Sequence, residues 1–153
     1  MTRSNAREIA VHMVYGLHFT DDAAGELMEV RLENEYYAGL KDETDVYAER
    51  PDKKQTDYIK ALVEGVHEKM QELDEYIEKY AVGWKLSRIS RISKAIMEVA
   101  MYEILYVDDV PTGVAINEAV ELCKHYEENE TASFVNGILG SFAKEVTSHV
   151  SGS

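Results

Sequence analysis

Asparagine and glycine lie inside two strongly apolar, helix-periodic segments of the chain, VPTGVAINEAVELCKHY at 110–126 and FVNGIL at 134–139. Asn117 and Asn136 belong to a residue type that forms helix interiors poorly, and Gly137 costs about 1 kcal/mol there relative to alanine. A structural explanation is that Gly137 allows the two helices to approach closely, while each amide pairs with backbone across the seam. The other explanation is that these residues belong to a binding surface.

Phe134 stands at the start of the second of these segments, three residues before Gly137. Its ring either faces outward as a stacking platform or belongs to the core. The sequence leaves both interpretations open.

Signatures of catalysis and of metal binding are sparse in this chain. One Glu-x-x-His pair, Glu64 and His67, lies on one helix face, whereas a carboxylate-bridged dimetal bundle needs two such pairs. The histidines and Cys123 show no zinc-ligand spacing, and no phosphate-binding glycine loop or nucleophile motif occurs. These observations favour a binding protein that uses no cofactor and no metal over an enzyme.

Length and composition indicate one globular domain or two small helical halves. The chain has 153 residues, of which 45% are hydrophobic and only two are proline. The single cysteine, Cys123, cannot form an internal disulfide, which suits a reducing compartment. No segment has the roughly 18 to 20 apolar residues that span a bilayer, and residues 1–17 lack the pattern of a signal peptide. We therefore expect a cytoplasmic protein with no membrane partner.

The net charge of -13 argues against a nucleic-acid partner, but its distribution is uneven. Residues 81–95 carry four basic residues at every third position and no acid, and two more arginines lie near the N-terminus. Over a turn or two of helix such a row lies along one side. It is a binding face for an anion, a solvated face, or a surface that meets the acidic half of the same protein. These basic residues are Lys85, Arg88, Arg91, Lys94, Arg3 and Arg7.

Hydrophobic periodicity predicts an all-α helical bundle without strands, because every apolar segment repeats at three and four residues. Ser4 or Asn5 is expected to cap the first helix, and residues 41–55 are expected to form a long loop. The predicted helices are 4–19, 23–40, 56–80, 90–106, 112–127 and 131–147. The predicted core residues are Leu62, Val66, Leu73, Ile116, Val120 and Ile138.

Four further segments, together with the two C-terminal ones, resemble the NusB family of transcription antitermination factors. They are REIAVHMVYGL at 7–17, DYIKALVEGV at 57–66, LDEYIEKYAVGW at 73–84 and AIMEVAMYEILY at 95–106. The resemblance implies one RNA-binding domain over residues 1–153, with about seven helices in two subdomains at about 4–80 and 81–147. It also implies that the protein has no enzymatic activity.

The resemblance further implies the partners of the protein. Members of the family bind boxA, a short uridine-rich single-stranded RNA, together with NusE, a ribosomal protein. The pair then joins an RNA polymerase antitermination complex on ribosomal RNA operons. A homodimer that hides the RNA face is a further possibility that the sequence leaves open. So is a stand-alone helical adaptor related to the N-terminal domain of ribosomal RNA methyltransferases.

Residue by residue, the resemblance implies an RNA surface at six positions. The arginine-rich N-terminus of the family is reduced here to two arginines, and a serine stands where a lysine can occur before the last helix. The six positions are Arg3, Arg7, Tyr15, Glu130, Ser133 and Phe134. For the basic ribosomal partner, we expect an acidic surface formed by Glu98, Glu103, Asp108 and Asp109.

Overall fold

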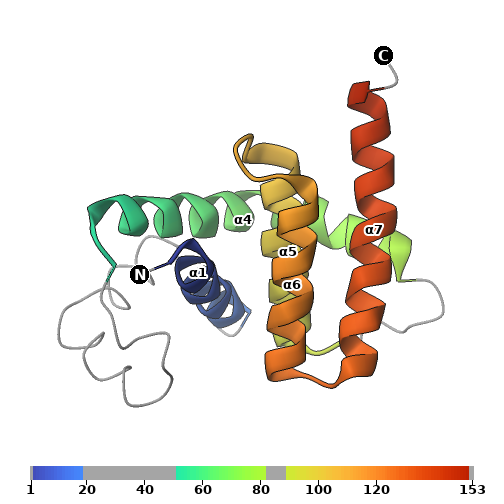
Figure 1. Cartoon of the computed structure of the whole chain (residues 1–153), viewed down its shortest axis with the longest axis horizontal. Coiled ribbons are helices and arrows are strands. Elements are labelled where there is room, and N and C mark those ends of the chain that lie inside the picture. The colour runs from blue at the N-terminus through green and yellow to red at the C-terminus, as the bar shows by residue number, and fades with distance from the viewer. Residues whose placement is uncertain (1, 19–50, 82–88, 152–153) are drawn as a thin grey trace. The chain divides into compact units, whose positions relative to one another are not determined.

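The computed structural model describes residues 2–18, 51–81 and 89–151, and most of these residues lie in helices (Figure 1). No strand occurs in these ranges, so the all-α prediction is confirmed there. The predicted helix 23–40, and the predicted loop up to residue 50, lie outside the described residues. The described helices are α1 (Arg3–Leu17), α4 (Lys53–Tyr80), α5 (Arg91–Tyr106), α6 (Thr112–Tyr126) and α7 (Asn129–Ser151).

The chain divides into two compact units, Met1–Glu68 and Lys69–Ser153. The division falls inside α4, whereas the sequence placed the subdomain boundary at the end of this helix, near residue 80. The physical reason is the length of α4. Its 28 residues carry apolar side chains along the whole helix, so its first half packs in one core and its second half in the other.

In the first unit, α1 begins one residue earlier than the sequence predicted. The side chain of Thr2 accepts a hydrogen bond of 3.1 Å from the backbone N–H of Asn5, so Thr2 is the cap rather than Ser4 or Asn5. A threonine cap satisfies one of the unpaired N–H groups of the first turn. Apolar residues from Ala6 to Leu17 are buried on most sides of α1, as expected.

The start of α4 lies three residues before the predicted position. Asp52 accepts a hydrogen bond of 2.8 Å from the N–H of Gln55, and the side chain of Gln55 accepts one of 3.0 Å from the N–H of Asp52. This reciprocal pair is a capping box, with aspartate in the serine or threonine position, and it fixes the helix start. Behind it, Ile59, Leu62 and Val66 are buried.

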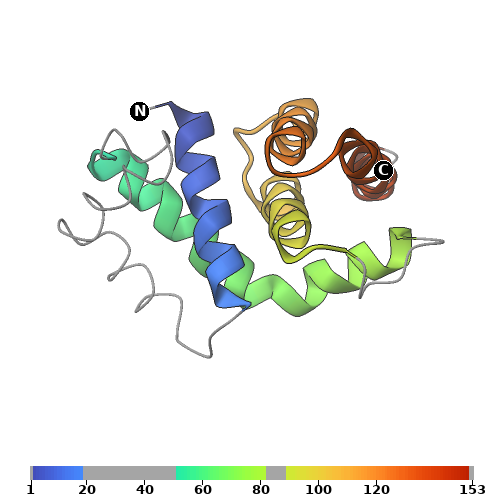
Figure 2. The ribbon, with the colours of Figure 1, turned by 90° about the horizontal axis from the view of Figure 1, so that it is seen from below.

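In the second unit, α5, α6 and α7 lie side by side, and residues 69–80 of α4 run across them (Figures 1 and 2). Helices α6 and α7 form an antiparallel pair joined by Glu127 and Glu128. The ring of Tyr76 on α4 meets the buried Phe142 on α7 edge-on, with 4.8 Å between ring centroids. This contact ties α4 to the three-helix group.

Four of the six predicted core residues are buried, namely Leu62, Val66, Leu73 and Ile138. The prediction is wrong for Ile116 and Val120, which are only half-buried. Helix α6 turns a different side inward, formed by Ala115, Ala119, Leu122 and Cys123. Small residues dominate that side, so α6 packs closely and leaves its larger aliphatic side chains at the edge of the core.

Candidate nucleic-acid interface

At the N-terminal end of α1, Arg3 is exposed and its guanidinium carbon lies 4.5 Å from the centroid of the Tyr58 ring on α4. A cation held over an aromatic face at this distance is attracted by the ring. Tyr15, farther along α1, is 36% exposed. The first unit therefore presents one positioned guanidinium and one accessible aromatic ring.

The structure corrects the prediction for Arg7, which is only 4% exposed. Arg7 lies on the side of α1 that also carries Ala6, Ala10 and Val14, and this side faces the core. A buried guanidinium requires partners within the protein, and Arg7 has them. Arg3 and Arg7 therefore do not form the exposed pair that was expected to reach successive phosphates.

Three of the predicted RNA residues lie near the start of α7, in the second unit. Glu130 and Ser133 are exposed, and Phe134 is half-buried, so its ring is neither a fully exposed platform nor a core residue. Successive residues of an α-helix are about 100° apart around its axis. Glu130 and Phe134, four residues apart, thus share one side of α7, whereas Ser133 lies toward another side.

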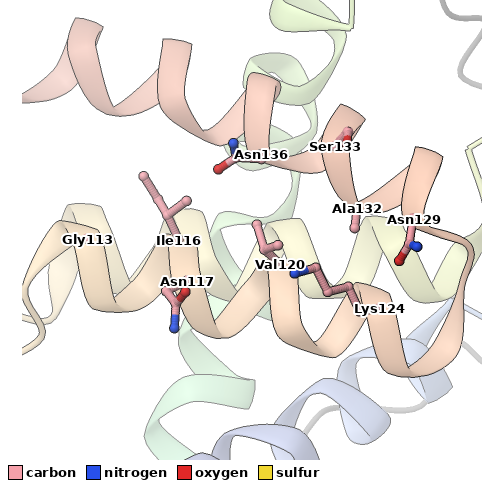
Figure 3. A pocket seen from close by; sticks show the side chains of 9 residues that line it. All are labelled: Gly113, Ile116, Asn117, Val120, Lys124, Asn129, Ala132, Ser133 and Asn136. Atoms are coloured by element: carbon pink, nitrogen blue, oxygen red, sulfur yellow. The ribbon is translucent and has the colours of Figure 1, made fainter.

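Beside Ser133, a pocket of about 490 Å³ lies between α6 and α7 (Figure 3). Ile116 and Val120 point from α6 toward α7, and Asn136 points from α7 toward α6 (Figure 3). The side chain of Lys124 extends along α6 toward Val120. The full lining is Gly113, Ile116, Asn117, Val120, Lys124, Asn129, Ala132, Ser133 and Asn136.

The two asparagines that the sequence singled out line this pocket. The explanation that their amides pair with backbone across the seam, and that Gly137 allows close helix approach, is wrong. Asn117 and Asn136 are exposed, and their side chains make no hydrogen bond within the described residues. A Cβ atom placed on Gly137 would meet nothing within 4 Å, so this glycine is not required for close helix approach. Lys124 and Asn129 also line the pocket and were not predicted from the sequence. The signal that could have found Lys124 is its helical spacing after Gly113, Asn117 and Val120.

The expected acidic partner surface is wrong at two of its positions, because Glu98 and Glu103 are both 0% exposed. Helix α5 lies inside the second unit and buries residues on nearly all sides from Ala95 to Met101. Asp108 and Asp109, which follow α5, are exposed as expected.

Burial raises the pKa of Glu98 to about 10, and a hydrogen bond with Asp74 adds to this effect while the charge of Lys94 opposes it. Glu98 is therefore a neutral carboxylic acid at neutral pH. It shares the α4–α5 contact with an ion pair in which Lys94 Nζ lies 3.2 Å from Asp74 Oδ2. The Glu98 carboxyl group thus contributes no charge to a partner surface.

Nearby, the Tyr106 hydroxyl donates to both carboxylate oxygens of Glu72, each at 3.0 Å. Burial and this hydrogen bond raise the pKa of Tyr106, whose side chain is still 42% exposed. The end of α5 therefore exposes an aromatic ring next to the two aspartates.

The predicted basic row does not form on α5. The side chain of Ser90 caps this helix, which begins at Arg91, and Lys85 and Arg88 lie outside the described residues. Arg91 is exposed, but the charge of Lys94 is directed to Asp74. Of the two described residues of the row, Arg91 is exposed and Lys94 is half-buried in its ion pair.

Metal binding and thiol chemistry find no support in the described ranges. Glu64 and His67 are both exposed, and nowhere in residues 2–18, 51–81 or 89–151 do three candidate ligands gather to hold a metal ion. Burial raises the pKa of the Cys123 thiol to about 11, which disfavours the reactive thiolate. None of the helices in these ranges has the length and apolarity of a membrane span.

These features define a helical protein whose accessible chemistry is that of binding: aromatic rings, amides and a few exposed cations. The chain matches the profile of the NusB family over residues 4–144, and it belongs to that family. The fold agrees, since Thermotoga maritima NusB superposes with a TM-score of 0.77 at 28% identity. That likeness covers 95% of this chain and 92% of the other.

Curated relatives extend the likeness along nearly the whole sequence. The transcription antitermination protein NusB of Acetivibrio thermocellus is 42% identical over 144 residues, which cover 94% of this chain and 90% of that protein. The corresponding protein of Bacillus subtilis is 35% identical over 95% of this chain and 98% of its own length. A crystal structure of NusB and NusE in complex with double-stranded RNA has the same fold, with a TM-score of 0.72 at 22% identity, covering 94% of this chain and 96% of the NusB-like chain.

Proposed function

We propose that this protein is a transcription antitermination factor. It binds boxA-type single-stranded RNA together with the NusE ribosomal protein, and the pair joins the RNA polymerase antitermination complex on ribosomal RNA operons in the cytoplasm. The observation that carries this proposal is membership of the NusB family, with antitermination proteins at 34–42% identity over nearly the full chain. The protein acts by binding and not by catalysis.

The RNA surface that we propose differs from the one that the sequence suggested. In the first unit it consists of Arg3 and Tyr15, and in the second unit of Glu130, Ser133 and Phe134. Single-stranded RNA exposes bases that stack on aromatic rings, while cations hold its phosphates. Arg7 is left out because it is buried, and its role is to stabilise α1.

For the ribosomal partner we propose the exposed end of α5 and the connection that follows it. Asp108 and Asp109 supply negative charge there, and Tyr106 supplies an aromatic ring. A basic protein is attracted to such a surface, and its arrival also offsets part of the net charge of -13 that repels RNA.

The decisive test is a titration of labelled boxA-type RNA with this protein, alone and with purified NusE. We expect weak binding alone and tighter binding with the partner, because the net charge of -13 opposes the approach of RNA and the basic partner offsets part of it. A boxA sequence with its order scrambled is the control for non-specific attraction. Equal affinity for boxA and scrambled RNA in the presence of NusE would contradict the proposal.

A further inference from the structure

The pocket between α6 and α7 has the size of a small-ligand site and carries polar side chains in its lining (Figure 3). Its volume of about 490 Å³ is within the range of roughly 300–1,000 Å³ that is usual for ligand pockets. The amides of Asn117 and Asn136 make no side-chain hydrogen bond within the described residues. Each amide offers both donors and an acceptor to whatever occupies the pocket.

The charge of the lining is unusual for this chain. The protein has 29 acidic residues and a net charge of -13, yet no acidic side chain lines the pocket. Lys124 is the single charged residue of the lining. Its Nζ lies 3.4 Å from Oε1 of the exposed Glu121, one turn back on α6, so the lysine can exchange this surface ion pair for a phosphate.

Aliphatic side chains complete the site. Ile116 and Val120, half-buried, point into the space between the helices (Figure 3). They offer apolar contact, and the amide of Asn136 extends from α7 on the opposite side of this space (Figure 3). An apolar face flanked by amides and one cation matches a nucleotide, whose base has apolar faces and a hydrogen-bonding edge. A docked protein helix would instead require a continuous apolar row.

We infer that this pocket binds one unpaired base of the RNA, with the amide of Asn136 on the hydrogen-bonding edge of the base and Lys124 near the adjoining phosphate. The inference rests on the proposed function, since it adds a base subsite to the RNA-binding protein. The subsite is distinct from the side of α7 that carries Glu130 and Phe134. A site-specific amide contact gives the protein a means to prefer one base at one position, which phosphate contacts cannot provide.

The test uses the full chain with NusE and a set of boxA-type RNAs, each with one nucleotide replaced by an abasic residue. For the parent protein, we expect one abasic position at which affinity falls at least about tenfold, because loss of that base removes the amide contact together with any stacking. Asn136→Ala should bind the intact RNA about tenfold more weakly. At that one abasic position, the variant should show no further loss, because the two changes remove the same contact.

The matched control is Gly137→Ala, the adjacent exposed residue that lines no part of the pocket. It should bind every RNA of the set as the parent does. Lys124→Gln should weaken binding to all RNAs and reduce the salt dependence by about one unit. Thermal melting of each variant checks that the fold is intact. We expect unchanged melting temperatures for the Asn136 and Lys124 variants, because both side chains are exposed.

The outcomes separate this inference from the proposed function. If Asn136→Ala binds intact RNA like the parent while Arg3→Ala weakens binding, the base subsite is wrong and the antitermination proposal stands. If Asn136→Ala loses affinity for NusE but not for RNA, the pocket holds a protein segment and the inference is overturned. A parent protein that binds no boxA RNA even with NusE refutes both.

Discussion

The ammonium group of Lys94 on α5 lies 3.2 Å from Oδ2 of Asp74 on α4, at the same contact that buries the carboxyl group of Glu98. Lys94 belongs to the basic row for which the sequence left open a role against acidic residues of the same protein, and here it pairs with Asp74. A glutamate that the sequence assigned to a partner surface is neutral in the core. The buried Glu98 is therefore not available to a partner, and the charge of Lys94 is already paired with Asp74.

This contact predicts an unusual pH dependence of stability. The pKa of Glu98 is about 10 in the folded protein, against an ordinary value of 4.5 that applies when the chain unfolds. Between these values the unfolded chain has lost the proton that the folded protein keeps. Stability should therefore fall as pH rises from about 5 to 9, by up to about 1.4 kcal/mol per pH unit from this group.

Glu98→Gln mimics the neutral acid at every pH. In urea unfolding, the free energy of unfolding of this variant should increase relative to that of the parent as pH rises from 5 to 9. Glu75→Gln, an exposed change on α4, is the control and should track the parent. A constant difference between Glu98→Gln and the parent across this range would show that Glu98 titrates normally.

Gly137→Ala should stabilise the protein by about 0.4–1 kcal/mol. Gly137 lies in the interior of α7, is exposed, and has nothing within 4 Å of a built Cβ, so alanine gains helix propensity without a clash. Gly140→Ala, which meets no atom either, should behave alike. Thermal melting measures both variants, and a lower melting temperature for Gly137→Ala would show that the helix seam needs the glycine.

Leu62→Ala should lower the free energy of unfolding by about 2–5 kcal/mol, because the Leu62 side chain is fully buried and its truncation leaves a cavity. Val120→Ala should cost clearly less, since Val120 is half-buried beside a pocket that is already present. Denaturant unfolding of the two variants makes the comparison. Equal losses would mean that Val120 belongs to the core after all.

The two N-terminal arginines should respond differently to alanine. Arg3→Ala should leave stability nearly unchanged, weaken RNA binding and flatten its salt dependence by about one unit, because Arg3 is exposed. Arg7→Ala should destabilise the fold by about 1–3 kcal/mol, because it removes a buried charged partner. Melting curves and RNA titrations of both variants separate the roles, and a stable Arg7→Ala protein with impaired RNA binding would restore Arg7 to the RNA surface.

Asp108→Lys should slow association with the basic ribosomal partner, most strongly at low salt where screening is weak. Glu75→Lys, on exposed α4 surface, is the control for net charge. Association rates measured at two ionic strengths decide the matter. If both variants slow association equally, the effect belongs to the overall charge and not to the end of α5.

The sequence by itself determined which of the described segments are helices, because helical periodicity is a local property of the chain. It also determined the family, because the family motifs are short runs of residues that can be read without a structure. It placed the starts of α1, α5, α6 and α7 to within two residues and that of α4 to within three. The starts of α1 and α4 are fixed by capping bonds of Thr2, Asp52 and Gln55, which depend on side-chain geometry that periodicity does not contain.

Only the tertiary structure decided which side of each helix faces the core. A shift of one or two positions around a helix exchanges buried and exposed residues, and that shift depends on the partners packed against it. This is why Arg7, Glu98 and Glu103 lie inside while Val120 lies at the edge of a pocket. Asn117 and Asn136 stood out in the sequence, but only the pairing of α6 with α7 showed that they line one pocket.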